Sequence, residues 1–165
     1  ANPADVAGIL VLIEPLVLRG LLKRRSGREV EIACRNREMF VWKRDDVTLG
    51  CASLQCFPDE PEKAELGCFV VSEKCRGKGH GSVLLAYVER VAVLQGLRAL
   101  FLLTTQTMQW FCERGFREAS LEELPPSKRA AYDVGRGSRV YIKWLDELPD
   151  AARERFSFVE VDSLD

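Results

Sequence analysis

The residues best suited to bind an anion lie between positions 65 and 81, where an apolar, β-prone run leads into a basic, glycine-rich loop. Arg76, Gly79 and Gly81 have the spacing Arg-x-x-Gly-x-Gly, and an amphipathic stretch over residues 82–94 follows. The first N–H groups of a helix have no partner within it, and the helix dipole is positive at that end. Glycine lets the backbone approach a phosphate closely. A strand, glycine loop and helix in this order predict a site for a phosphate-bearing ligand.

The loop differs from two widespread phosphate-binding patterns. It lacks the Gly-Lys-Ser/Thr that ends a Walker motif. The run Gly77-Lys78-Gly79-His80-Gly81 also has no glycine at the last place of Gly-x-Gly-x-x-Gly.

Composition indicates an ordinary globular protein. The 165 residues are 47% hydrophobic and 30% charged, and we expect one domain over residues 1–165. The net charge of -1 argues against a dedicated nucleic-acid binder. We also expect no membrane partner, because the apolar run 9–22 is interrupted by Glu14, Pro15 and Arg19 and lacks the pattern of a secretion signal.

The cysteines predict neither a metal site nor a disulfide framework. There are six, none in a Cys-x-x-Cys pair, and His80 is the only histidine. Zinc would need better-spaced ligands, so we expect no metal. Reduced thiols suit the cytoplasm, the chloroplast stroma or the mitochondrial matrix.

Hydrophobic periodicity and turn residues predict an α/β chain. We expect helices over residues 3–15, 26–35, 82–94 and 107–114. We expect strands over residues 21–23, 39–43, 48–56, 64–71, 97–104 and 139–145. The strands at 64–71 and 97–104 flank a helix, which predicts a parallel βαβ unit. After Pro149 we expect a short helix or a frayed end.

Further stretches carry a specific resemblance. They are Arg24-Arg25-Ser26, residues 65–71, Leu103-Thr104-Thr105, residues 110–116 (Trp-Phe-Cys-Glu-Arg-Gly-Phe), residues 124–128 and residues 136–140. Together with the glycine loop they resemble the GNAT family of acetyl-CoA-dependent N-acetyltransferases, and more closely the catalytic domain of its N-acetylglutamate synthase branch. The similarity runs from about residue 12 to 145.

The resemblance implies a GNAT fold, a mixed and splayed sheet with acetyl-CoA wedged between the two central strands and with helices on its faces. Glu65 would act as the general base, and the backbone N–H of Cys68 would polarise the thioester carbonyl. The residues implied to hold the coenzyme are Cys68, Phe69, Val70, Arg76, Gly77, Lys78, Gly79, His80, Gly81 and Ser82. For His80 we expect the backbone to matter and not the ring.

The resemblance also implies the acceptor. Arg25, Arg136 and Ser138 would hold the carboxylates of L-glutamate, which suits the two-pronged geometry of Arg. The reaction would then be direct transfer from acetyl-CoA to L-glutamate in a ternary complex, the first step of arginine biosynthesis.

The sequence departs from the family pattern in places. Cys112 stands where many GNAT enzymes have a tyrosine that protonates the leaving thiolate, so the general acid stays unassigned. Gln106 stands where the branch commonly has a basic residue. We expect no amino-acid-kinase-like domain in this chain.

Alternatives remain open at this point. The chain could acetylate another small amine or amino acid, or could bind acyl-CoA without turnover as a regulatory module. The basic acceptor site disfavours polyamines and lysines, and Glu65 disfavours a non-catalytic module. The sequence leaves open whether a homo-oligomer forms.

Overall fold

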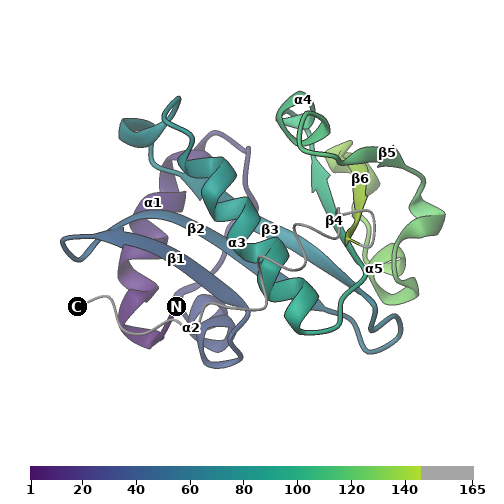
Figure 1. Cartoon of the computed structure of the whole chain (residues 1–165), viewed down its shortest axis with the longest axis horizontal. Helices are drawn as coiled ribbons and strands as arrows, with labels where there is room; N and C mark the ends of the chain where they lie inside the picture. The colour runs from purple at the N-terminus through teal and green to yellow at the C-terminus, as the bar shows by residue number, and fades with distance from the viewer. Residues whose placement is uncertain (146–165) are drawn as a thin grey trace.

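The computed structural model describes residues 1–145 and contains a mixed, six-stranded sheet in the order β1-β2-β3-β4-β6-β5 (Figure 1). The strands are β1 (Met39–Arg44), β2 (Val47–Cys56), β3 (Lys63–Val71), β4 (Ala99–Thr104), β5 (Arg117–Ala119) and β6 (Arg139–Trp144). The only parallel pair among the described residues is β3 with β4. The expectation for the tail after Pro149 lies outside the described residues.

The first predicted helix is confirmed but runs further than expected. A 3-10 turn (Pro3–Asp5) leads into α1 (Val6–Leu18), which contains Pro15 instead of ending there. The expected strand at 21–23 is wrong. Gly20 takes a φ of 71°, and the N–H groups of Leu21 and Leu22 donate back to the carbonyl of Leu16. These bonds close the end of α1 and make the segment a helix C-terminal turn.

The second helix is confirmed, and the strands expected at 39–43 and 48–56 are present as a hairpin. α2 (Gly27–Arg35) begins after Ser26, whose side chain accepts from the N–H of Glu29 in a capping box. β1 and β2 form an antiparallel pair. Asp45 and Asp46 both have positive φ, 50° and 60°, which is the conformation of a type I′ turn. The pair Asp-Asp therefore takes the turn type that Asn-Gly usually forms.

The βαβ unit is also confirmed, and its strands diverge. α3 (His80–Leu94) connects β3 to β4. The parallel register covers only Lys63↔Ala99, Ala64↔Leu100 and Glu65↔Phe101. Beyond Glu65 the edge of β3 that faces β4 is unpaired, and in Figure 1 β4, β6 and β5 turn away from the first three strands. The sheet is therefore splayed where the ligand was expected.

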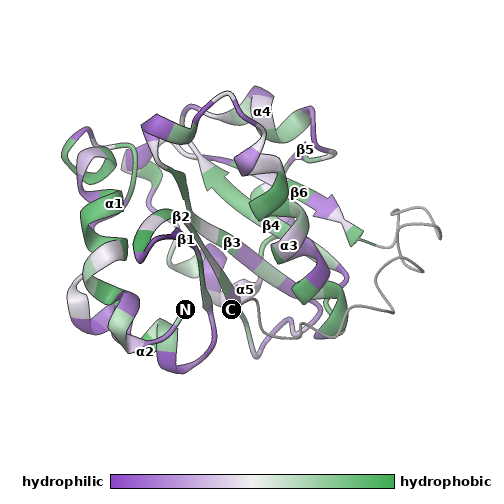
Figure 2. Ribbon diagram, turned by 60° about the vertical axis from the view of Figure 1, so that its left-hand side comes forward, coloured by the Kyte–Doolittle hydropathy of each residue, from purple (hydrophilic) through white to green (hydrophobic). Residues whose placement is uncertain are grey.

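A bulge in β3 exchanges the two faces of that strand. The register with β2 passes from Ser53↔Gly67 to Cys51↔Val70, and Cys68 has a φ of 48°. Before the bulge, Leu66 packs in the core cluster beneath α3; after it, Cys68 packs in the cluster beneath α1 and α2. Figure 2 shows α1 and α2 on one face of the sheet and α3 on the other.

The C-terminal part returns along β4. α4 (Met108–Cys112), a 3-10 turn (Leu121–Glu123), α5 (Pro126–Ala130) and a second 3-10 turn (Val134–Arg136) lie between β4 and β6. β6 pairs antiparallel with β4 over its whole length, from Thr104↔Arg139 to Ala99↔Trp144. The residues just before β6 therefore lie beside the carboxyl end of β4.

Candidate active site

The glycine loop presents unpaired backbone N–H groups. Gly77 and Gly79 have φ values of 73° and 80°, a region that other residues avoid. Gly79 is the N-cap of α3 and supplies no side-chain cap. Within residues 1–145, no acceptor is recorded for the N–H groups of residues 77–81. These donors and the positive end of α3 form an environment that favours an anion.

A cavity of about 660 Å³ opens beside this loop. Its walls include β3 (Phe69, Val71), the glycine loop and residues 104–107 at the carboxyl end of β4. Seven of the residues expected to hold a coenzyme line it: Phe69, Arg76, Gly77, Gly79, His80, Gly81 and Ser82. Cys68, Val70 and Lys78 do not; the side chains of Cys68 and Val70 are buried on the α1 and α2 face, and that of Lys78 is exposed.

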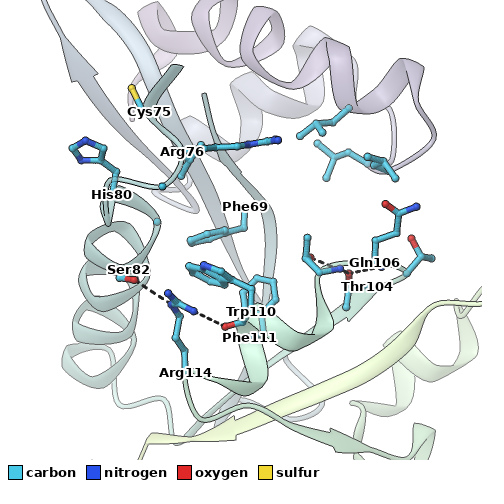
Figure 3. A pocket seen from close by; sticks show the side chains of 18 of the residues that line it. Phe69, Cys75, Arg76, His80, Ser82, Thr104, Gln106, Trp110, Phe111 and Arg114 are labelled. Atoms are coloured by element: carbon cyan, nitrogen blue, oxygen red, sulfur yellow. Dashed lines mark hydrogen bonds between the residues drawn. The ribbon is translucent and has the colours of Figure 1, made fainter. Parts of the chain in front are cut away.

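One wall of the cavity holds a cation that the sequence did not predict. Arg114 Nε donates to Ser82 Oγ at 3.1 Å, and Nη1 donates to the carbonyl of Trp110 at 2.8 Å. Its guanidinium also lies over the Trp110 ring, 3.7 Å from the centroid. Figure 3 shows the rings of Phe69 and Trp110 between Arg76 and Arg114. Only the position of Arg114, just before Gly115 at the end of the predicted fourth helix, could have suggested it.

The single histidine has a neighbour on β1. The His80 ring stacks on Trp42 with centroids 4.3 Å apart and planes 25° apart. This contact holds the His80 ring against β1, and the role expected for the His80 backbone stays a prediction.

The bulge is held by a buried cysteine pair. Cys51 Sγ donates to the carbonyl of Cys68 at 3.3 Å, and both side chains are buried. The hydrogen bond with Cys68 and the burial both raise the pKa of the Cys51 thiol well above its usual value. A protonated thiol there is a donor that supports the unusual backbone of Cys68.

Glu65 lies at the point where β3 and β4 separate. It is the last residue of β3 paired with β4, opposite Phe101. Its carboxylate is 2.6 Å from Lys128 Nζ, a partner on α5 that sequence reasoning missed. Glu65 does not line the 660 Å³ cavity.

Arg25 approaches the same strand. A Cβ built on Gly67 would lie 3.5 Å from Arg25 Nη2 and 2.9 Å from Ser53 Oγ. The guanidinium therefore lies over a stretch of β3 that has no side chain, two residues from Glu65. The structure brings Arg25 to this strand.

For Arg136 and Ser138 the structure gives only an approximate position relative to the cavity. Arg136 is exposed, and no ion pair or side-chain hydrogen bond is recorded for it within residues 1–145. The Ser138 carbonyl accepts from the Tyr132 hydroxyl. Because Arg139 pairs with Thr104, both residues lie near the carboxyl end of β4, where Thr104 and Thr105 line the cavity.

Residues 1–145 contain neither a cluster of candidate metal ligands nor a helix suited to a membrane. No three His, Cys, Asp or Glu side chains in this range gather closely enough to hold a metal ion. None of the helices in the same range combines the length and the apolar character that crossing a bilayer requires.

The sequence profile of the Acetyltransferase (GNAT) family matches residues 18–116, which include β3, the glycine loop, α3 and β4. The chain belongs to the GNAT family of acetyltransferases. The splayed β3–β4 pair and the glycine loop are therefore the elements of a GNAT domain.

Two bacterial relatives of this GNAT domain carry the name amino-acid acetyltransferase. The domain is 38% identical over 147 residues to the amino-acid acetyltransferase of Mannheimia succiniciproducens, covering 89% of this chain and 33% of the relative. It is 41% identical over 142 residues to the enzyme of that name from Pseudomonas fluorescens, covering 86% of this chain and 32% of the relative. The chain thus spans about a third of the length of the relatives it matches.

Two solved structures of an N-acetylglutamate synthase are also similar to this chain. The N-acetylglutamate synthase of Neisseria gonorrhoeae, in complex with coenzyme A and N-acetyl-glutamate, superposes with a TM-score of 0.80 at 36% identity, over 86% of this chain and 33% of that chain. The same enzyme with coenzyme A and L-arginine gives a TM-score of 0.76 at 34% identity, over 87% of this chain and 32% of that one.

Proposed function

We propose that this GNAT domain transfers the acetyl group of acetyl-CoA to the amino group of L-glutamate. The observation that carries the proposal is the gap between β3 and β4 beyond Glu65, with the glycine loop at one end of the adjoining cavity. Similarity to the Neisseria gonorrhoeae N-acetylglutamate synthase, whose structure contains coenzyme A and N-acetyl-glutamate, supports the choice of both ligands.

The coenzyme would lie along the cavity. Its phosphates would accept from the N–H groups of residues 77–81, and its pantetheine arm would pair with the free edge of β3 near Cys68, Phe69 and Val70. Arg114 would add a cation next to Ser82. Because the Ser82 oxygen accepts from Arg114, the hydroxyl proton is available to a phosphate oxygen.

The acceptor would lie where the strands separate. Arg25, Arg136 and Ser138 would bind the carboxylates of the amino acid, and Glu65 would remove a proton from its ammonium group, directly or through water. The neutral amine would attack the thioester carbonyl carbon, whose oxygen would accept from the Cys68 N–H. The C–S bond then breaks, the attacking nitrogen loses its second proton as it becomes an amide, and the coenzyme thiolate takes up a proton, so that one proton passes in net from nitrogen to sulfur.

The direct test is turnover by the purified chain with acetyl-CoA and an amine panel of L-glutamate, a polyamine and a lysine peptide. Because Cys56 and Cys112 are exposed and would react with a thiol reagent, the acetylated product is best measured by mass spectrometry. N-acetyl-glutamate as the main product is expected. Preferred turnover of another amine would replace glutamate in the proposal, and coenzyme binding without any turnover would indicate a non-catalytic module.

A second test separates the two ligands. Arg136→Ala is expected to raise the KM for glutamate far more than the KM for acetyl-CoA. An equal rise in both values would remove Arg136 from the acceptor site.

A further inference from the structure

The ion pair between Lys128 and Glu65 is one of the more enclosed ones in the described part of the molecule. Nζ lies 2.6 Å from Oε2, and the side chains are 25% and 16% exposed, respectively. Such a distance is that of a charge-assisted hydrogen bond, and partial burial shields the pair from solvent screening. Lys128 is therefore a strong electrostatic neighbour of the proposed general base.

The segment that carries Lys128 is fastened to the strand that carries Glu65. Lys63 Nζ, at the start of β3, donates to the carbonyl of Glu123 at 2.9 Å. Asp59, in the loop before β3, accepts from the N–H of Ser127 at 2.7 Å and from its hydroxyl at 2.8 Å. Both attachments come just before the Lys128–Glu65 contact on their segments, and Leu124, between Glu123 and Ser127, is buried. The short helix α5 is thus held in one place against β3.

The position of the pair matters for the chemistry. Glu65 is the last residue of β3 that pairs with β4, so the contact from α5 reaches the point where the strands separate. A substrate ammonium that donates to the Glu65 carboxylate would come close to the Lys128 cation. Like charges in proximity favour loss of a proton from the group that can give it up. Lys128 would therefore favour the neutral amine, which is the nucleophile.

We propose that Lys128 is a positioning residue for the acetyl transfer: it fixes the Glu65 carboxylate at the end of the paired strands and favours the neutral form of the acceptor amine. This inference rests on the proposed function, since it needs an amine that loses its proton at Glu65. The proton passes from the ammonium to Glu65 while Lys128 keeps its own.

The test compares the wild-type chain with Lys128→Met, Lys128→Arg and Arg129→Met. Arg129 is the adjacent residue on α5 and pairs with exposed Glu122, so its variant controls for loss of a cation from the same helix. The pH profile of kcat is measured with saturating acetyl-CoA and with whichever amine the wild-type chain acetylates, because kcat reports groups in the bound complex. Circular dichroism checks that each variant is folded.

For Lys128→Met we expect kcat to fall about tenfold near neutral pH and the acid limb to move up by about one pH unit, as removal of a neighbouring cation does. Lys128→Arg should restore most of the rate, and Arg129→Met should resemble the wild type. A merely structural role would lower kcat by the same factor at every pH. That result, or an unchanged Lys128→Met profile, would overturn the inference while leaving the proposed function standing. A wild-type chain that acetylates no amine of the panel would overturn both.

Discussion

Arg25 lies against the bare backbone of Gly67, with Nη2 3.5 Å from where a Cβ on that glycine would be. Ser53 Oγ is closer still, at 2.9 Å from the same point, and Ser53 is buried. Ser53 Oγ uses space that exists only because position 67 has no side chain, and Arg25 Nη2 lies at ordinary contact distance from that space. The guanidinium can therefore come within two residues of Glu65 on one face of β3.

This relationship predicts a selective effect of Gly67→Ala. A Cβ 2.9 Å from Ser53 Oγ cannot be accommodated unless the buried Ser53 side chain or β3 itself shifts, and a shift of β3 would change its contact with the half-buried Arg25. We expect the KM for the acceptor amino acid to rise about tenfold with little change in the KM for acetyl-CoA, because misplacing a binding group weakens binding of its own ligand. Steady-state kinetics with each substrate varied in turn measures this.

The matched control is Gly27→Ala, where the added Cβ would meet only Leu10 Cδ1 at 3.6 Å, an ordinary contact. Its kinetics should match the wild type. If Gly67→Ala also left both KM values unchanged, the stretch of β3 around Gly67 would not form part of the acceptor site.

Arg114 gives a prediction for the coenzyme. Arg114→Gln removes the cation that donates to Ser82 and stacks on Trp110. The dissociation constant for acetyl-CoA is expected to rise about tenfold, or about 1.4 kcal/mol, a moderate value for a charge-assisted contact. Calorimetry measures the affinity directly.

Two comparisons sharpen that measurement. Arg117→Gln removes an exposed cation of β5 that pairs with Glu123, and it should leave the affinity unchanged. Dephospho-coenzyme A shows which phosphate is involved: if Arg114→Gln weakens it as much as coenzyme A, Arg114 acts on the diphosphate, and if it does not, on the 3′-phosphate. Equal affinity of wild type and Arg114→Gln for both compounds would exclude Arg114 from the coenzyme site.

Sequence reasoning predicted the glycine loop and the helix after it, which the structure contains, because their signals are local. The loop between residues 76 and 81 has a glycine pattern, and the helix after it has a periodic apolar face. The bulge at Cys68 has no such signal, since a cysteine at a φ of 48° depends on Cys51 of the neighbouring strand. The contact of Lys128 with Glu65 likewise depends on where α5 packs. The sequence could not predict these contacts, because they depend on tertiary packing.

A buried pair beneath α3 predicts a stability effect. Lys143 Nζ lies 2.6 Å from Glu89 Oε1, with the side chains only 14% and 11% exposed. Lys143→Met would leave a buried carboxylate without its partner, and we expect a loss of about 3–5 kcal/mol in the free energy of unfolding. The double change Glu89→Leu with Lys143→Met should recover most of this loss, because an apolar pair has no charge to desolvate. Urea unfolding gives both values.

The pH dependence of the same variant has a definite sign. Burial raises the pKa of Glu89, against the lowering effect of Lys143. A carboxyl whose pKa is higher in the folded state binds more protons there, so its contribution to stability grows as the pH falls toward that pKa. Without Lys143 the pKa of Glu89 in the folded state rises further. The free energy of unfolding of Lys143→Met should therefore increase more than that of the wild type on going from pH 8 to pH 5. A parallel dependence in both proteins would show that Glu89 is not buried in its charged form.

Alanine substitutions at two glycines, one in the glycine loop and one outside it, can separate the effect of backbone strain from the effect of its position. Gly79 and Gly96 both have positive φ, 80° and 79°, and a Cβ on either would meet nothing within 4 Å. Alanine at either position therefore carries the same left-handed strain, about 1–2 kcal/mol, without a clash. Gly79→Ala can relieve it only by turning the loop whose N–H groups would hold the coenzyme, so its affinity for coenzyme A should fall about fivefold. Gly96, in the turn after α3, does not line the cavity, and Gly96→Ala should lose similar stability with unchanged affinity. If calorimetry found the two variants equal in affinity, the loop backbone would not be the phosphate site.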